Sequence, residues 1–332
     1  MKTNRPHKFS TNAKAAYIGR AVSRWNNRGN SLAAAVRTTL NDLRNETGLN
    51  TLTKIDKPTI DQYIDSLRER LEEGELSSAT TADRVSALNT TLQYMGKDDL
   101  TVSAKEYGLS RGPVDTSDKS NTREAAAAVT GVMYDRGRDD SRYMVLYHST
   151  ILQEAFNLRA RESFGIKITE KDPDAPKLII DKGDLPKNGR PREIPIRNDH
   201  QRQVLREARE FAKSQGWRSL IPPEYSLTEW KNFAYSALNE IREAVGHLEF
   251  HFHGERHYYA HERFQGLWQE KTGEGLRCPA VMGLGIREWR EYAFNATGLS
   301  MDQIKEIDKE IRLEISEELG HSRVDVTRYY LG

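Results

Sequence analysis

Four of the nine histidines fall within residues 251–261, and their spacing suits two kinds of chemistry. His257 and His261 are four positions apart, so on a helix they could share a zinc ion. The residues between them are Tyr-Tyr-Ala, without the glutamate base of an HExxH motif, and no nearby Cys or Asp offers a third ligand, so we expect no metal site. His253 and Arg256 would share one helical face and could present a proton acceptor and a fixed cation to one phosphate. The alternative is a helix whose histidines and aromatic residues are buried only for packing.

The carboxyl end carries a second group of side chains that could act on a phosphate. His321 stands nine positions before Tyr330, directly after Leu319 and Gly320, and Thr327 stands three positions before the same tyrosine. A tyrosine hydroxyl can form a covalent bond to phosphorus. Its pKa of about 10 means that it needs help from neighbouring cations or from a base.

Four sequence boxes, in their order along the chain, resemble those of the tyrosine recombinases, or phage-type integrases. That family's pattern is Leu-Arg-x-x-Glu with an aliphatic residue four positions later, a lysine before an Arg-x-hydrophobic-Pro strand, His-x-x-Arg followed by His, and Leu-Gly-His with Thr-x-x-Tyr. The matching segments are residues 158–162 with Ile166, Lys187 before residues 192–196, residues 253–257, and residues 319–330. The helical first third, including residues 74–80, also resembles the family's core-binding domain, so the resemblance covers nearly the whole chain.

The resemblance implies an enzyme that cleaves and rejoins DNA through a 3′-phosphotyrosine formed by Tyr330. A phosphodiester repels nucleophiles by its charge, and its alkoxide leaving group is poor, so transfer requires cations at the phosphate oxygens. Arg159 and Arg256 suit this task, because a guanidinium grips phosphate oxygens in a bidentate fork.

The other matched residues receive their roles from the same resemblance. His253 is the candidate base, His321 a hydrogen-bond donor to the pentacoordinate phosphorane, and Lys187 the candidate general acid for the 5′-hydroxyl leaving group. Glu162 is expected to orient a neighbouring histidine or arginine, and His257 to support the site. Neither a metal nor another cofactor is expected, because the phosphotyrosine keeps the bond energy for rejoining.

Three of these assignments have a competitor of the same residue type nearby. Tyr329 adjoins Tyr330, but the spacing from the threonine and the histidine of the last box favours Tyr330. Arg161 competes in the first box, where the Arg-x-x-Glu spacing favours the earlier arginine. Lys182 competes for the hairpin lysine, where the offset before Arg192 favours the later one.

The sequence departs from the family pattern in three places. Asn157 stands where the family has a glycine before Leu-Arg. The gap of 65 positions from Arg256 to His321 is longer than in the family, and we interpret residues 268–318 as an insertion, either structural or in contact with a protomer or DNA. Only two residues follow Tyr330, whereas many relatives carry a further helix that docks on a neighbouring protomer. We expect that contact to be absent here, to be made by another segment, or to be missing from this sequence.

Helical periodicity dominates the segments that must position these residues. In the first third, Leu32, Val36, Leu40 and Leu43 form an apolar stripe at helical spacing, and Pro58 is well placed near the start of a later helix. We predict a helical core-binding domain over residues 1–107, and the N-terminal end of this range is a basic arm.

The rest of the chain is expected to contain one small β element. Residues 108–121 are dense in Gly, Pro, Ser and Asp and predict a linker. Residues 178–180 and 192–196 have strand character and flank a turn at residues 186–189, which predicts a β-hairpin with Lys187 near its tip. The predicted fold class is thus mainly α with a small β-hairpin or sheet (α+β), with a tyrosine-recombinase catalytic domain over residues 122–332.

The charge of the chain is distributed unevenly. The 332 residues carry a net charge of +1, yet residues 1–44 hold nine Lys and Arg against one acid, a local charge of +8. Such a basic arm is typical of a protein that binds the phosphate backbone, although a solvated helix face would look the same. The candidate DNA contacts are Lys14, Arg20, Arg24, Arg28 and Arg37.

Composition excludes several classes of protein. A single cysteine, Cys278, rules out an internal disulfide framework and a multi-cysteine metal cluster. No apolar run is long enough for a membrane span, and no signal core follows the N-terminus, so we expect a cytoplasmic, DNA-associated protein.

The function expected from these observations is that of a site-specific DNA recombinase, the integrase of a phage or integrative mobile element. The resemblance implies double-stranded DNA as partner and a homo-tetramer on DNA that is a monomer or dimer when unbound, with accessory DNA-bending proteins or a directionality factor as further partners. Alternatives are a non-catalytic DNA-binding regulator on the same scaffold, a telomere resolvase, and an activity like that of type IB topoisomerases. A metal-dependent hydrolase built on the histidine cluster is a further rival from another class.

Overall fold

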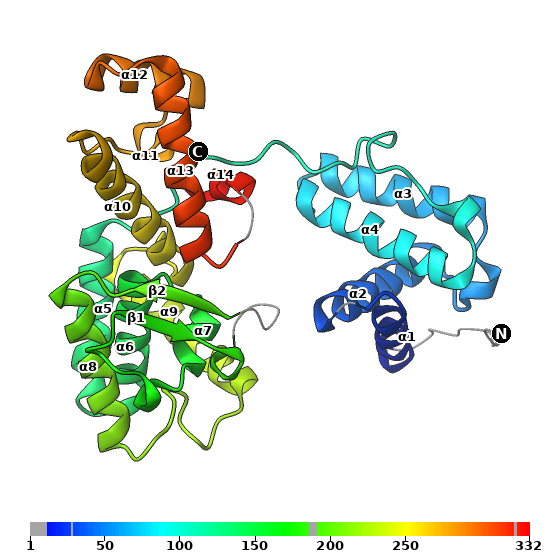
Figure 1. Cartoon of the computed structure of the whole chain (residues 1–332). Helices are drawn as coiled ribbons and strands as arrows, with labels where there is room; N and C mark the ends of the chain where they lie inside the picture. Colours follow the sequence, from blue (N-terminus) through cyan, green and yellow to red (C-terminus); the bar gives the residue numbers. More distant parts are fainter. Residues whose placement is uncertain (1–11, 28, 186–190, 322–323) are drawn as a thin grey trace. The chain divides into compact units, whose positions relative to one another are not determined.

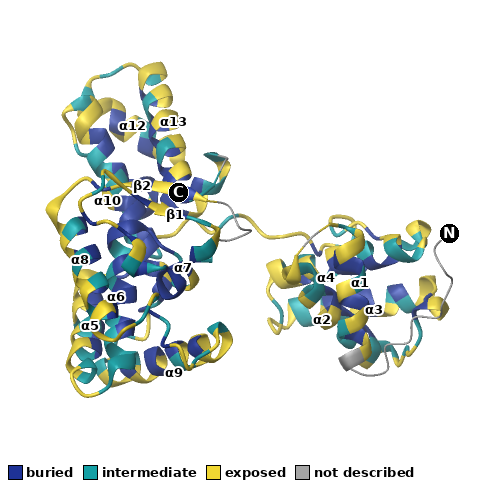
Figure 2. Cartoon of the chain, turned by 60° about the horizontal axis from the view of Figure 1, so that its bottom comes forward, coloured by how far each residue is buried: buried dark blue, intermediate teal, exposed yellow. Residues whose placement is uncertain are grey.

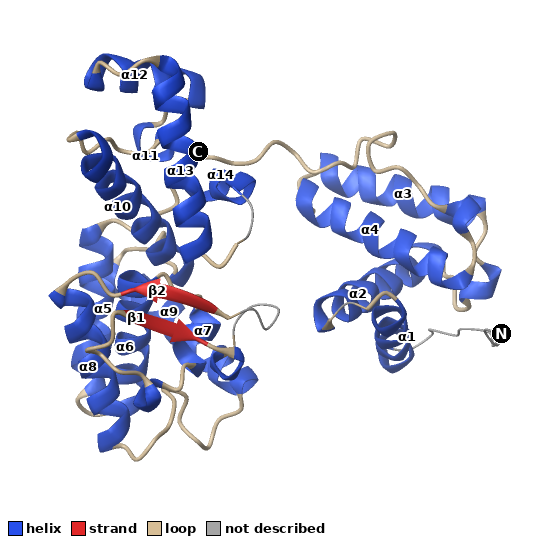
Figure 3. Cartoon of the chain, in the orientation of Figure 1, coloured by secondary structure: helices blue, strands red, loops and turns tan. Residues whose placement is uncertain are grey.

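The computed structural model describes residues 12–27, 29–185, 191–321 and 324–332. The chain divides into two compact units, Met1–Pro113 and Val114–Gly332 (Figure 1). Helices dominate the described residues of both units, and the second unit holds a two-stranded antiparallel sheet (Figure 3). This confirms the predicted fold class. Among the described helices, none is long and apolar enough to cross a membrane.

The described residues of the first unit form four helices and two short 3-10 turns. They are α1 (Asn12–Trp25), α2 (Asn30–Thr47), η1 (Leu52–Lys54), α3 (Lys57–Glu72), α4 (Ser78–Met95) and η2 (Asp98–Leu100). Helices α1 and α2 pack closely at Gly19, where a Cβ atom would collide with the carbonyl oxygen of Ala33. A glycine is therefore required at this crossing.

The core of the first unit follows the predicted apolar stripe. Val36, Leu40 and Leu43 on α2 are fully buried, while Leu32 is half-buried. Local signals fix the ends of the next two helices: the Asp56 side chain accepts from the backbone at the start of α3, and the Ser77 side chain does the same for α4. The helices thus begin where the sequence places capping residues.

The second unit holds the remaining elements. Before the long C-terminal helices these are α5 (Arg123–Gly137), α6 (Ser141–Phe156), α7 (Ala160–Gly165), η3 (Ile168–Glu170), β1 (Lys177–Ile180), η4 (Lys182–Asp184), β2 (Arg192–Pro195), α8 (Asp199–Ser214) and α9 (Leu227–Val245). Strands β1 and β2 pair antiparallel with Lys177 opposite Pro195 and Ile180 opposite Arg192. Lys187 lies outside the described residues, in the segment that joins these strands. Figure 2 shows the buried residues concentrated along the inner sides of α6, α7 and α10.

The C-terminal part of the second unit forms a separate hydrophobic cluster. Its elements are α10 (Phe252–Thr272), α11 (Pro279–Met282), α12 (Ile286–Thr297), α13 (Met301–Glu318), η6 (Val324–Thr327) and α14 (Arg328–Leu331). Trp268 and Trp289 are fully buried in this cluster, and Tyr330 and Leu331 belong to it as well. Residues 268–318 therefore help to build the surface on which α14 packs.

The segment between the two helical regions is ordered by its own side chains. The carboxylate of Asp115 accepts hydrogen bonds from the backbone and hydroxyl of Ser117, and Asp118 accepts the same pair from Ser120. These are two successive turns in which an Asp side chain takes the place of a backbone acceptor. They lead directly into the buried residue Asn121.

Candidate active site

The site begins where α6 ends, at Asn157. This residue is fully buried and has φ = 54°, the left-handed conformation that ends many helices. Its carbonyl oxygen accepts hydrogen bonds from the guanidinium groups of Arg192 and Arg256. Asparagine tolerates this conformation better than other non-glycine residues, which explains how it can replace the glycine of the family pattern.

Glu162 is the central acceptor of the arginine cluster. Its side chain is buried and accepts from the backbone and guanidinium of Arg159, both at 2.8 Å, and from Arg192 at 2.8 and 2.7 Å. Burial alone would raise the pKa of this carboxyl, but the hydrogen bonds and charge of Arg192, together with Arg159, lower it to about 2. Glu162 is therefore a permanent anion that orients two arginines.

Arg256 lies on the other side of the same cluster and is fully buried. Its Nη2 donates to the carbonyl oxygen of Leu319 at 3.3 Å, and its buried Nε has no hydrogen-bond partner among the described residues. Burial and the charges of Arg159 and Arg192 outweigh the nearby Tyr330 and Glu162, so the pKa of Arg256 falls to about 10. It remains protonated at neutral pH.

The cluster carries a positive excess. Two guanidinium groups, those of Arg159 and Arg192, pair with the one carboxylate, and Arg256 donates to the Asn157 carbonyl that Arg192 also contacts. Buried charge that is not fully compensated is unfavourable in the absence of a counter-ion. An anion with several oxygens, such as a phosphodiester, is the ligand that this arrangement would stabilise.

The end of α13 brings the last box to the arginines. Leu319 is buried, and Gly320 follows with φ = 72°. A Cβ atom on Gly320 would lie 3.0 Å from Cδ of Arg192, so a larger residue would press on the cluster. This glycine lets the chain turn so that His321 approaches the site.

Tyr330 lies beside the cluster in its own chain. Its ring is 5.9 Å from the Arg256 guanidinium, 4.7 Å from the His257 ring and 5.7 Å from the His253 ring, measured between centres. The His321 ring is 6.5 Å away. Tyr330 is 6% exposed, so it is enclosed by these groups.

The competing tyrosine has a different environment. Tyr329 is 46% exposed and has no ring contact with the histidines or the arginines among the described residues. The structure therefore brings Tyr330, and not Tyr329, to the arginine cluster.

Three histidines form a row along α10: His253, His257 and His261 are spaced by four positions, so they lie on one face of the helix. Their rings follow each other at 5.2 and 6.2 Å. His253 is exposed, and partial desolvation with the charge of Arg256 lowers its pKa to about 4; His257 is buried, and burial beside the other histidines lowers its pKa to about 3. Both rings are neutral at pH 7, and a neutral imidazole can accept a proton.

The start of α10 is held by Asn121 from the linker. The Asn121 amide donates to the carbonyl oxygen of His251 and to Glu255, at 2.9 and 2.8 Å, and accepts from the backbone N–H of His251 at 3.1 Å. Arg123 pairs with the other oxygen of Glu255 at 3.0 Å and lies over the Tyr258 ring. These contacts fix the helical turn that carries His253 and Arg256.

The remaining competitors lie at the surface. Arg161 and Lys182 are exposed, Arg161 on α7 and Lys182 in η4 after β1. The structure thus brings Arg159, Arg256, Glu162, His253, His257, His321 and Tyr330 together, and it leaves Lys187 outside the described residues. Within the described part of the chain, no group of three or more His, Cys, Asp or Glu residues could hold a metal ion.

The candidate DNA contacts of the first unit lie on α1 and α2. Lys14, Arg20 and Arg24 are exposed on α1 and Arg37 is exposed on α2, while Arg28 lies outside the described residues. Arg20 and Arg24 share a helical face with the exposed Tyr17.

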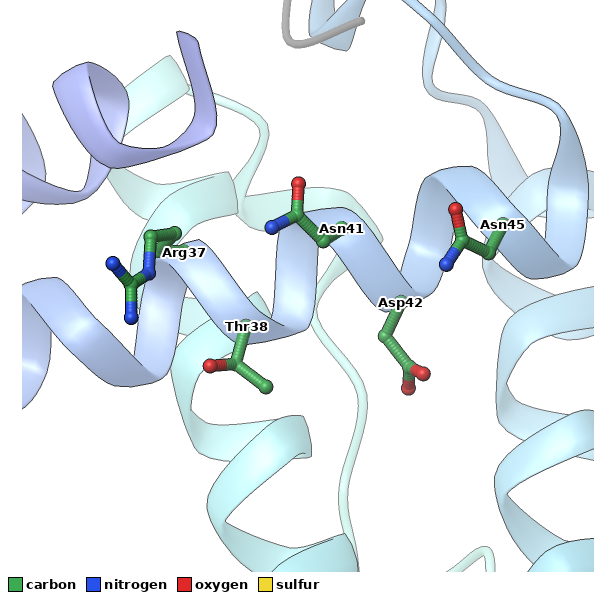
Figure 4. A pocket seen from close by; sticks show the side chains of 5 residues that line it. All are labelled: Arg37, Thr38, Asn41, Asp42 and Asn45. Carbon is green, nitrogen blue, oxygen red and sulfur yellow. The ribbon is translucent and has the colours of Figure 1, made fainter. Parts of the chain in front are cut away.

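A groove of about 480 Å³ runs along α2 beside these residues. It is lined by Arg37, Thr38, Asn41, Asp42 and Asn45 (Figure 4). The one carboxylate, Asp42, is occupied by Arg70, Arg84 and the Tyr63 hydroxyl. The other side chains along the groove are neutral or basic hydrogen-bonding groups.

Sequence reasoning missed three residues that the geometry brings into the site. Arg192 served only as a marker of the strand, yet it pairs with Glu162. His261 was considered only as a metal ligand, yet its Nε2 lies 2.7 Å from the carbonyl oxygen of Tyr330. Asn121 was part of a presumed linker. The periodic spacing of the three histidines was the available signal for His261; nothing in the sequence signalled the contacts of Asn121.

No protein-family model matches this sequence, and no curated protein is similar to it in sequence. Solved structures do match. The XerH site-specific recombinase bound to a palindromic difH substrate aligns over 98% of this chain and 82% of its own, with TM-score 0.53 and 14% identity. The Tn1549 transposon integrase in complex with a circular intermediate DNA aligns over 96% of this chain and 95% of its own, with TM-score 0.58 and 12% identity. This chain therefore has the fold of the tyrosine recombinases, which the four sequence boxes predicted.

Proposed function

We propose that this chain is a site-specific DNA recombinase that cleaves and rejoins DNA through a 3′-phosphotyrosine at Tyr330, as the integrase of a phage or integrative mobile element. The observation that carries the proposal is the contact of Tyr330 with Arg256 and with two neutral histidines of its own chain. The matching structures are DNA complexes of a recombinase and an integrase, which supports DNA as the substrate.

In the proposed cleavage step, the phenolic oxygen of Tyr330 attacks the phosphorus of a phosphodiester. The bond from phosphorus to the 5′ oxygen breaks, and a tyrosyl ester of the 3′ phosphate and a 5′-hydroxyl end are formed. The phenol proton passes to His253, and the leaving oxygen takes a proton from a general acid. Rejoining is the reverse, with a 5′-hydroxyl as nucleophile, and consumes no cofactor.

The arginine cluster would stabilise the charge that develops on the phosphate. Arg159 is partly exposed, and both it and Arg256 donate to one carbonyl oxygen, so their guanidinium groups converge. Preorganised donors of this kind each contribute about 10²–10³ in rate. Glu162 and Arg192 would hold the two arginines in place.

Two proton-transfer roles and two supporting roles belong to the proposal. His253 acts as the acceptor because its lowered pKa keeps the ring neutral, and His257 supports it by contacting the Tyr330 ring. His321 donates a hydrogen bond to the phosphorane. Lys187 is the general acid, on the connection between β1 and β2.

The first unit would supply much of the affinity for DNA. The exposed basic residues of α1 and α2 suit the phosphate backbone, and the groove on α2 offers amide and hydroxyl groups that can read base edges. Exchange of strands between two duplexes needs four cleavages, so a homo-tetramer on DNA is the proposed assembly.

The proposal is tested with a nicked suicide substrate that carries the DNA sequence flanking the gene. Cleavage of this substrate releases a short fragment, so the strand cannot be rejoined and the covalent adduct accumulates. Wild type should form an adduct in the presence of EDTA, Tyr330→Phe should form none, and Tyr329→Phe, the matched control, should behave like wild type. Absence of any adduct with wild type, or an adduct with Tyr330→Phe, would falsify the mechanism.

A further inference from the structure

Helix α14, which carries Tyr330, is too short to hold its own position. It spans the four residues Arg328–Leu331, a length at which a helix in isolation is unstable. The direction of the Tyr330 side chain therefore depends on contacts from other elements to the main chain of α14.

One such contact comes from His261 on α10. This side chain is 6% exposed, and its Nε2 lies 2.7 Å from the main-chain carbonyl oxygen of Tyr330. A carbonyl oxygen only accepts, so Nε2 must carry the hydrogen, which fixes the protonation of this ring nitrogen.

The other ring nitrogen of His261 faces the linker. Its Nδ1 lies 3.7 Å from the carboxylate of Asp118, which in turn accepts from Ser120. Burial lowers the pKa of His261, against the opposing effects of the Tyr330 carbonyl and Asp118. The ring is thus enclosed between α14 and an ordered turn of the linker, with little freedom to rotate.

His257 and His261 contact different parts of the same residue. The His257 ring lies 4.7 Å from the Tyr330 ring at an interplanar angle of 33°, while His261 reaches the main chain. One histidine therefore restrains the side chain and the other restrains the backbone from which that side chain projects.

We propose that His261 is a positioning residue for Tyr330: its Nε2–H donates to the main-chain carbonyl oxygen of Tyr330 and fixes the main chain of α14, so that the phenolic oxygen is aimed at the phosphate. The inference rests on the proposed function, because it concerns the nucleophile of that reaction. Misplacement of a reacting group by about 1 Å can lower a rate by about a hundredfold. Loss of this one hydrogen bond should therefore slow cleavage without touching the chemistry of the leaving group.

The test compares two substitutions that fill the same space. His261→Gln keeps an N–H at a similar reach, whereas His261→Met keeps the volume and loses the donor. In single-turnover cleavage of the suicide substrate, we expect His261→Met to be slower than wild type by about tenfold to a hundredfold and His261→Gln to recover most of the rate. DNA affinity and Tm should be the same for both variants. His200→Met replaces an exposed histidine of α8 and is the control for the loss of a histidine.

A second substrate separates positioning from acid catalysis. Sulfur in place of the bridging 5′ oxygen gives a leaving group that needs no proton, so a defect in the general acid disappears on this substrate. The defect of His261→Met should persist. The positioning role would be overturned if the Gln and Met variants cleaved at equal rates, or if the defect of His261→Met disappeared on the sulfur substrate. Either result would leave the proposed function intact, provided that wild type still formed adducts that depend on Tyr330. If wild type forms no such adduct, the proposed function fails first.

Discussion

Arg159 and Arg256 donate hydrogen bonds to the same main-chain oxygen, that of Leu319, at 3.0 and 3.3 Å. Two guanidinium groups that share one acceptor must lie close together, although Arg159 precedes α7, Arg256 lies on α10, and the two are distant in the sequence. The Leu319 carbonyl brings the pair together at the end of α13, directly before the turn that leads to His321. The convergence is thus part of the fold and does not wait for a ligand.

Replacement of one arginine of this pair tests the importance of its fork geometry. Arg159→Lys keeps the positive charge but loses the planar, bidentate arrangement of donors. We expect single-turnover cleavage to slow by about 10²–10³, with little change in DNA affinity, because the donors act mainly on charge that develops in the transition state. Arg161→Lys, two positions away on the exposed side of α7, should have no effect. Equal rates for Arg159→Lys and wild type would mean that Arg159 does not contact the phosphate.

Glu162 is expected to contribute to stability more than any surface carboxylate does. Glu162→Gln would leave the buried Arg192 and the partly buried Arg159 without their shared anion, which costs about 3–5 kcal/mol when a buried pair is broken. Glu193→Gln is the matched control, because that carboxylate pairs with Lys177 at the surface, where a salt bridge contributes about 0–1 kcal/mol. Urea unfolding of both variants measures the difference. Similar free energies of unfolding would show that the arginine cluster is compensated in another way.

The sequence predicted the helices well where local signals were strong. The apolar stripe on α2 and the proline near the start of α3 depend on residues within one or two helical turns, so they can be inferred without knowledge of the fold. The start of α8 is less easily inferred, because Asn198 and Asp199 are both suitable capping residues and Asn198 is the one that caps the helix. A cap depends on the backbone angle of a single residue, which the sequence does not specify.

The catalytic boxes could be recognised by resemblance, but the contacts that hold them together could not. Nothing in the sequence indicates that Glu162 pairs with Arg192 or that Asn121 forms hydrogen bonds with His251, because these pairs join segments far apart in the chain. The linker illustrates the same point: its composition predicted an irregular segment, yet Asp115 and Asp118 give it two ordered turns. Long-range pairing depends on how the helices pack, and packing is a property of the folded chain.

The buried histidine of α6 predicts how stability depends on pH. His148 is 8% exposed, lies against the Phe211 ring at 5.0 Å, and has its pKa lowered by burial from 6.5 to about 4. Below about pH 6.5 the unfolded chain binds a proton at His148 that the folded chain does not bind. The contribution of His148 to the free energy of unfolding is therefore fully present above that pH and is lost as the pH falls toward 4. Integrated over pH, this difference in proton binding lowers the free energy of unfolding by about 2 kcal/mol between about pH 6.5 and 4.5.

His148→Leu isolates this effect, because other buried histidines such as His257 contribute equally to both proteins. Urea unfolding at a series of pH values should give a smaller loss of stability for the leucine variant than for wild type, by the same 2 kcal/mol or so. Parallel pH profiles for the two proteins would mean that His148 is protonated in the folded state.

The residues of the groove on α2 could make two kinds of DNA contact, which the dependence of the binding constant on salt concentration distinguishes. Arg37 is exposed and charged, so if it binds a phosphate, Arg37→Ala should weaken binding to all sequences alike and reduce the slope of log K against log salt concentration by about 0.9. Asn41 carries no charge, and its side chain lines the groove. An amide of this kind can pair with adenine in the major groove. Asn41→Ala should therefore weaken only the specific complex, by about 1–3 kcal/mol, and leave the salt slope unchanged.

Titration of specific and random duplexes at several salt concentrations, with Glu106→Ala as a surface control in the same unit, measures both quantities together. An unchanged slope for Arg37→Ala would remove this arginine from the phosphate contacts. A uniform loss of affinity for Asn41→Ala on both duplexes would place the base-reading residues on another helix, because a side chain that reads a base edge cannot weaken binding to every sequence equally.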